Sequence, residues 1–172
     1  VRGFCCLRAG VVGFTDNVRI TSIIGDFLEH GRIYHFAAGK EDPLHGEWYI
    51  GSADWMKRNL SQRVETVTPI NDEAARRRLC RIIEVNLADR HNAWSLDCAG
   101  VWHHLSPPDD ADEDGPAVLG TFATLRRDAM RAEIEGMADR KAVSSLLKSL
   151  PEPKSRQDDA PRLGGVERLA GL

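Results

Sequence analysis

The stretch SPPDDADEDGP at residues 106–116 divides the sequence into two parts of unlike composition. Before it, short apolar segments alternate with turn residues, as is typical of a folded domain. The stretch itself is acidic and proline-bearing, which is typical of a linker. After it, residues 117–150 fit one or two helices, and few large apolar residues follow. We therefore predict a domain over residues 1–105, an acidic linker over 106–116, and a helical to disordered tail over 117–172.

The first 105 residues mix strand-like and helix-like segments. Apolar residues at helical spacing predict helices over residues 18–28 and 71–89, the second of which opens with an Asn-Asp cap. Segments rich in β-branched and aromatic residues predict strands or hairpins, and these are the end of a buried strand within 1–10, then 32–36, 48–52, 63–70, and a hairpin over 92–105. This mixture predicts an α/β fold, with a sheet flanked by helices.

Composition limits the classes of function that the chain can have. The formal net charge is −3, so a polyanion would have to be bound by a local group of arginines rather than by a general basic field. No apolar segment is long enough to span a membrane, and no secretion signal is evident. The four cysteines lack zinc-site spacing, which favours free thiols in a reducing cytosol.

The segment GDFLEHGRIYHF carries the first chemical signal. If a strand begins at His30, then His30 and Arg32 lie on the same face of it. A guanidinium binds phosphate oxygens through paired hydrogen bonds, and an imidazole can transfer a proton or attack phosphorus near neutral pH. This pair therefore predicts phosphate chemistry. The alternative is that His30 is a structural residue at the C-terminal end of the helix over 18–28.

The segment IGSADWMKRNLSQRVE carries the second signal. Ser52 and Asp54 follow a turn at Gly51, where they can orient an imidazole or a phosphate oxygen. Arg58 and Arg63 add positive charge to the same segment. A His-x-basic pair followed by a Gly-Ser-x-polar turn has the layout of one half of a phospholipase D-like active site. In the alternative interpretation, these arginines only form salt bridges that stabilise the domain.

Several longer strings together resemble one family, and these are VRGFCCLRAG, NVRITSIIGDFLEHGRIYHF, WYIGSADWMKRNLSQRVETVTPI and LADRHNAWSL. In order and spacing they resemble the last catalytic domain of polyphosphate kinases of the first type. The resemblance covers roughly residues 1–105. It implies a phospholipase D-like fold with a mixed sheet and flanking helices, the second of two such domains in the parent enzyme.

The resemblance also implies an activity and a site. Such kinases transfer the terminal phosphate of ATP reversibly to polyphosphate through a phosphohistidine. That histidine belongs to the preceding domain, so it would lie upstream of Val1, and the fragment alone would be inactive. Arg2 and His30 match the family's ATP-contacting arginine and histidine. Arg32, Arg58 and Arg63 would extend the basic lining for the polyanion.

Further expectations follow from the same resemblance. Mg²⁺ would accompany ATP, although no ligands for it are identified in this segment. The partners would be ATP, ADP and polyphosphate, with a homo-oligomer formed through the full-length protein and without nucleic acid or a transmembrane segment. The location would be cytoplasmic, either free or peripheral to the membrane.

Two other functions stay open from the sequence. One is a phospholipase D-like phosphodiesterase that uses His30 as its nucleophile. The other is a non-catalytic domain that binds polyphosphate, which is motivated by Asp26, an acidic residue where the family usually has arginine.

Overall fold

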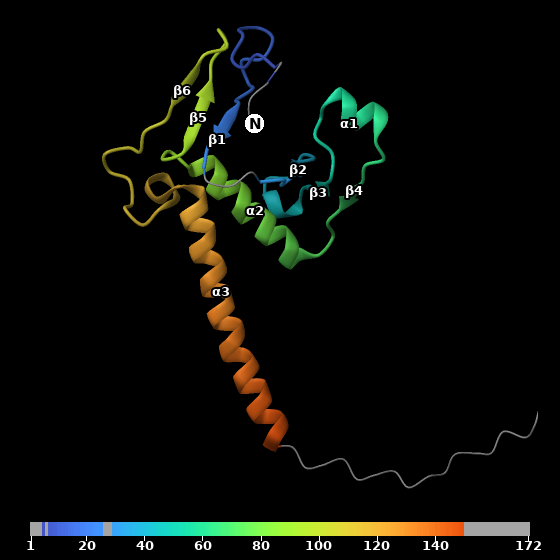
Figure 1. The fold of residues 1–172 in the computed structure, drawn as a ribbon, viewed down its shortest axis with the longest axis vertical. Helices are drawn as coiled ribbons and strands as arrows, with labels where there is room; N and C mark the ends of the chain where they lie inside the picture. The colour runs from blue at the N-terminus through green and yellow to red at the C-terminus, as the bar shows by residue number, and fades with distance from the viewer. Residues whose placement is uncertain (1–4, 6, 26–28, 150–172) are drawn as a thin grey trace, which may run out of the picture. The chain divides into compact units, whose positions relative to one another are not determined.

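The computed structural model describes residues 5, 7–25 and 29–149. The elements follow one another as shown in Figure 1, and they are β1 (Thr21–Ile23), β2 (Ile33–Phe36), the 3-10 helix η1 (Pro43–His45), β3 (Glu47–Gly51), α1 (Lys57–Gln62), β4 (Val67–Pro69), α2 (Glu73–Ala88), β5 (Ala93–Leu96), β6 (Trp102–His104) and α3 (Pro116–Ser149). This mixture confirms the α/β class. None of the helices in the described ranges is long and apolar enough to cross a membrane.

One sheet consists of β2, β3 and β4 in antiparallel order. Its register pairs His35 with Trp48, and Trp48 is buried. Strands β2 and β4 lie within the predicted ranges 32–36 and 63–70, and β3 overlaps the predicted range 48–52 but begins and ends one residue earlier, so the three strand predictions are confirmed. The pairing continues beyond β2, because the Gly51 amide donates to the Arg32 carbonyl at 3.0 Å. The backbone next to the first predicted site residues is therefore tied to this sheet.

The second sheet consists of β1, β5 and β6, also antiparallel. The hairpin predicted over residues 92–105 is confirmed, with β5 and β6 as its strands. The prediction of a helix over residues 18–28 is wrong for residues 18–25, because this described part contains β1 and no helix. The β-branched residues Ile20, Thr21 and Ile23 favour an extended backbone. Pairing with β5 supplies the hydrogen bonds, among them that from the Leu96 amide to the Ile20 carbonyl at 3.0 Å.

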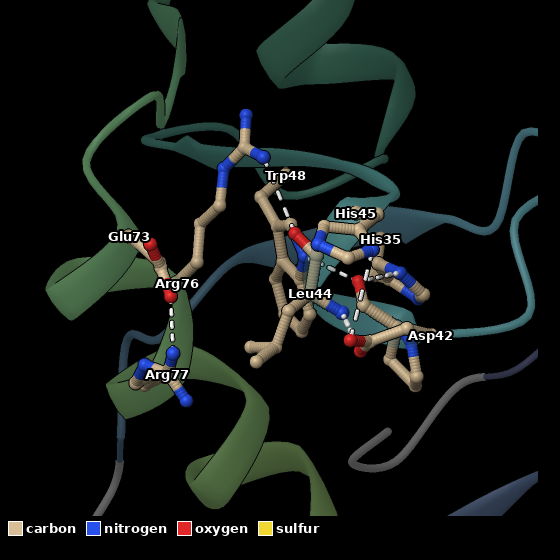
Figure 2. Close-up of polar contacts among 9 residues, drawn as sticks. His35, Asp42, Leu44, His45, Trp48, Glu73, Arg76 and Arg77 are labelled. Atoms are coloured by element: carbon tan, nitrogen blue, oxygen red, sulfur yellow. Dashed lines mark hydrogen bonds and ion pairs between the residues drawn. The ribbon is translucent and has the colours of Figure 1, made fainter.

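Helix α2 confirms the helix predicted over residues 71–89. Its N-terminus is capped by Asp72, whose carboxylate accepts from the Ala75 amide at 2.7 Å. Arg76 reaches from α2 to η1, where Nη1 donates to the Leu44 carbonyl at 3.2 Å (Figure 2). In the same region Trp48 Nε1 donates to the Pro43 carbonyl at 2.9 Å. These bonds fix α2 and η1 against the sheet of β2, β3 and β4.

The carboxylate of Asp89 connects the end of α2 to the start of α3. It is fully buried, and Oδ1 accepts from the amides of His91 and Asn92 at 2.8 and 2.7 Å. Oδ2 accepts from the Thr121 amide at 2.7 Å. Helix α3 is interrupted at Gly120, so the prediction of one or two helices over 117–150 is confirmed for the described residues.

By their contacts the residues divide into two compact units, Val1–Ala132 and Glu133–Leu172. The first part of α3 thus belongs to the first unit. The disordered end predicted from residue 151 lies outside the described residues, as do most of the strand residues predicted within 1–10. The described cysteines Cys5, Cys80 and Cys98 are free thiols.

Candidate active site

His30 and Arg32 lie in the coil that leads into β2. The strand begins at Ile33, so the condition under which both side chains would lie on one strand face, a strand that begins at His30, is not met. The expected helix end at His30 is also absent, because residues 29–32 are coil and residues 26–28 lie outside the described part of the chain. The histidine side chain is exposed to solvent. An exposed imidazole on a coil is open to a ligand from outside the chain.

A carboxylate pairs with one of these two side chains. The Arg32 guanidinium forms an ion pair and hydrogen bond with Asp54 Oδ1. The Arg32 side chain is 14% exposed, whereas that of Asp54 is 42% exposed. The hydrogen bond from Arg32 is the main cause that holds the pKa of Asp54 below its ordinary value, and the charges of Arg32 and His30 act in the same direction. The structure therefore brings Arg32 and Asp54 into contact, in the coil that also carries His30.

The segment that carries Asp54 is held on both sides. Before it, Ala53 is buried, and its carbonyl accepts from the Tyr34 hydroxyl at 3.3 Å. After it, the Trp55 indole donates to the same hydroxyl at 3.1 Å, and the two rings lie 5.8 Å apart. The Asp54 carbonyl accepts from the Met56 amide at 2.7 Å, and Asn59 in α1 helps to lower the pKa of Asp54. Strand β2 and helix α1 thus set the position of this carboxylate.

Ser52 connects the end of β3 to the residues before β4. Its hydroxyl donates to Glu65 Oε2 at 2.5 Å and accepts from the Thr66 amide at 3.0 Å. The Ser52 amide donates to the Thr66 carbonyl at 3.0 Å. The sequence predicted that Ser52 could orient an imidazole or a phosphate oxygen, whereas here the hydroxyl bonds to the adjacent strand segment.

The remaining predicted arginines differ in their surroundings. Nη1 of Arg63 lies 3.8 Å from Oε1 of Glu65, so the carboxylate partly compensates the positive charge of Arg63. Arg58 is in the first part of α1 and is exposed. Arg2 lies outside the described residues. The alternative that these arginines form salt bridges is met for Arg32 and Arg63, each of which has a carboxylate partner.

Sequence reasoning missed the two side chains that support Asp54. Tyr34 is separated from Asp54 along the chain by η1 and β3. Asn59 is close to Asp54 in the sequence, but an asparagine inside a short helix carries no distinct signal. Among the described residues, no three His, Cys, Asp or Glu side chains lie close enough together to hold a metal ion. We therefore assign no chemical step to a metal at these residues.

Comparison with known proteins gives consistent matches. A family model described as polyphosphate kinase C-terminal domain 2 matches residues 1–114. The polyphosphate kinase of Thermosynechococcus vestitus is 48% identical over 120 residues, which are 69% of this chain and 16% of that protein. The polyphosphate kinase of Pseudomonas aeruginosa is 46% identical over 107 residues, which are 62% of this chain and 15% of that protein.

A solved structure matches as well. The crystal structure of polyphosphate kinase from Porphyromonas gingivalis superposes with a TM-score of 0.61 at 32% identity, covering 73% of this chain and 18% of that one. The chain thus spans about a sixth of the length of the curated relatives that it matches.

Proposed function

Because the chain belongs to the polyphosphate kinase family, matching its C-terminal domain 2, we propose that it forms part of an enzyme that transfers the terminal phosphate of ATP reversibly to polyphosphate. In this proposal the phosphohistidine is supplied by a preceding domain, upstream of Val1. The 172-residue chain would contribute binding and electrostatic stabilisation to a shared site. On its own it would therefore not synthesise polyphosphate.

The observation that carries this proposal is the exposed imidazole of His30 beside the pair of Arg32 and Asp54. A protonated imidazole can donate a proton to the leaving oxygen or stabilise the transferring phosphoryl group. Phosphoryl transfer depends mainly on such positioning and charge stabilisation. We assign His30 this role.

The arginines of the site would supply the rest of the positive charge. Arg58 is exposed on α1, and Arg63 keeps 57% of its side chain exposed despite its pairing with Glu65. Both can reach a flexible polyanion from solvent. We propose that they line the path of polyphosphate and that Arg2, which resembles the family's ATP-contacting arginine, contacts ATP. Arg32 adds positive charge beside His30.

The cofactor and setting follow from the same proposal. Mg²⁺ would arrive with the phosphates of ATP, whose oxygens are the ligands that this ion prefers. The partners would be ATP, ADP and polyphosphate, in a homo-oligomeric phosphoprotein located in the cytoplasm or at the membrane periphery. Nucleic acid is not expected as a partner, since the net charge of −3 provides no extended basic surface.

The test is ATP-driven polyphosphate synthesis by the intact polypeptide that carries this chain, with and without His30→Ala. We expect the variant to lose at least roughly a hundredfold in kcat, as for loss of a general acid. His103→Ala is a matched control, because His103 is an exposed histidine that pairs with Asp97 on the β5–β6 hairpin. Full activity of His30→Ala would contradict the role of His30.

Two other results would replace the proposal. Turnover of a model phosphodiester that is lost in His30→Ala, without polyphosphate synthesis, would favour a phosphodiesterase. Tight, salt-sensitive binding of polyphosphate without any turnover would favour a binding domain. Synthesis by the 172-residue chain alone would contradict the claim that the phosphohistidine lies upstream.

A further inference from the structure

Arg32 is poorly placed to bind phosphate directly. Its side chain is only 14% exposed, and its guanidinium is already paired with the Asp54 carboxylate. A phosphate ligand would have to displace that carboxylate and approach a largely covered group. By contrast, Arg58 and Arg63 are exposed and open to a polyanion. The role of Arg32 is therefore better sought in the structure of the site than in contact with substrate.

Asp54 forms bonds to more than one part of the site. Its carboxylate pairs with Arg32, and its carbonyl accepts from the Met56 amide at 2.7 Å, directly before α1. A carboxylate has two oxygens and can accept several hydrogen bonds at once. The same residue thus connects the coil before β2 to helix α1.

Asn59 provides a separate observation. Its side chain is buried, and its Oδ1 has no hydrogen-bond partner among the described residues. A buried oxygen without a partner lowers stability, so an apolar residue would pack at lower cost in this position. What the asparagine supplies in return is a polar side chain that helps to lower the pKa of Asp54. This arrangement favours a residue kept for the position of Asp54 rather than for stability.

We propose that Asp54 is a positioning residue, which fixes Arg32 and, through it, the coil that carries His30, with the buried side chain of Asn59 as its support. Arg32 then serves to fix the site and does not contact phosphate. The inference rests on the proposed function for the chemistry that His30 performs. The arrangement of Arg32, Asp54 and Asn59 can be tested without that chemistry.

The first experiment measures the Arg32 guanidinium in the 172-residue chain by ¹H–¹⁵N NMR, before and after Asp54→Asn. We expect restricted rotation of the guanidinium in the unmodified chain and free rotation in the variant. Glu73→Gln is the matched control, because it removes the carboxylate of an exposed arginine pair on α2, that of Glu73 with Arg77. Free rotation of Arg32 in the unmodified chain, or no change in Asp54→Asn, would overturn the proposal.

The second experiment separates positioning from phosphate binding in the intact polypeptide. If Asp54 positions His30, then Asp54→Asn lowers kcat by roughly tenfold or more and changes KM for polyphosphate by less than about threefold. If Asp54 instead competes with phosphate for Arg32, the variant lowers KM and keeps kcat, which would overturn the proposal. If the intact polypeptide makes no polyphosphate, the proposed function fails, and the Arg32 signal alone decides the positioning role.

A third variant, Asn59→Leu, tests the buried support. Leucine removes the whole side-chain amide, including the unpaired oxygen, and it has a higher helix propensity than asparagine. We expect the variant to unfold at the same temperature as the unmodified chain or higher, while the Arg32 guanidinium becomes mobile. An immobile Arg32 in this folded variant would show that Asn59 does not support Asp54.

Discussion

Gly120 shows at the scale of one residue how α3 can be interrupted inside its length. Its φ is +77°, a backbone conformation that residues with a Cβ rarely adopt. A Cβ built there would lie 2.4 Å from Nδ2 of Asn92, closer than atoms approach. The kink in α3 therefore requires glycine for two reasons, backbone conformation and space.

We predict that Gly120→Ala lowers the free energy of unfolding by about 1–3 kcal/mol. Gly136→Ala is the control within the same helix, because a Cβ at Gly136 meets open space. That variant should leave stability unchanged or raise it by about 0.5–1 kcal/mol. Chemical denaturation followed by circular dichroism measures both. Equal effects of the two substitutions would contradict the argument from Gly120.

The Asp54 carboxyl makes stability depend on pH. Because its pKa in the folded chain lies below the ordinary value of 3.8, the ionised form is favoured by folding. This stabilisation is present above pH 3.8 and is lost as the pH falls through the lowered pKa. We predict that Asp54→Asn destabilises the chain at neutral pH and that the difference from the unmodified chain closes below pH 3.8. Chemical denaturation of both chains at about pH 7 and about pH 3 measures this difference in the free energy of unfolding. The same difference at both pH values would contradict the lowered pKa of Asp54.

At the scale of elements, Asp89 joins the C-terminal end of α2 to the start of α3. Three backbone amides donate to one buried carboxylate, and no solvent can replace them there. Removing one partner of buried hydrogen bonds leaves the others unpaired, which is costly. The junction of the two helices is thus held by one side chain.

We predict that Asp89→Ala lowers the free energy of unfolding by about 3 kcal/mol or more. Asp97→Ala is the comparison, since Asp97 also accepts from backbone amides, those of Ala99 and Val101, but in an exposed turn. Its removal should cost about 1 kcal/mol, because water can replace it. Urea denaturation of both variants gives the measurement. A smaller loss for Asp89→Ala than for Asp97→Ala would contradict the role of burial.

At the scale of the whole molecule, the first compact unit extends to Ala132 and includes the start of α3. Two contacts join the start of α3 to the rest of this unit. Thr121 donates to Asp89, and a Cβ built on Gly25 would lie 1.8 Å from the ring of Phe122. The boundary predicted at residue 105 stays a prediction, and truncation of the chain provides its test.

We predict that a chain ending at Ala132 unfolds with the same cooperativity and midpoint as the first unit of the whole chain. A chain ending at Leu105 lacks the partner of Asp89 and the ring beside Gly25, so it should lose at least about 2 kcal/mol of stability. Thermal and urea unfolding of the two truncated chains tests the difference. Equal stability of both would support a domain that ends at residue 105.

Local signals in the sequence are enough to predict several elements of this protein and its family. Helix α2 is recognisable by its Asp72 cap and its apolar spacing, and the β2–β3 and β5–β6 pairs by their alternation and turn residues. The motif strings pointed to the polyphosphate kinase family, which the matched family model and relatives confirm. Each of these signals acts over a few neighbouring residues.

Other features form only when residues that are far apart in the sequence come into contact in the folded chain. Residues 18–28 have apolar spacing that also fits a helix, and pairing with β5 makes β1 a strand. Arg32 meets Asp54 22 residues along the chain, and Asp89 meets Thr121 32 residues along. Local patterns do not encode such pairs, because the free energy that selects them comes from burial and hydrogen bonds formed after the chain has folded back on itself.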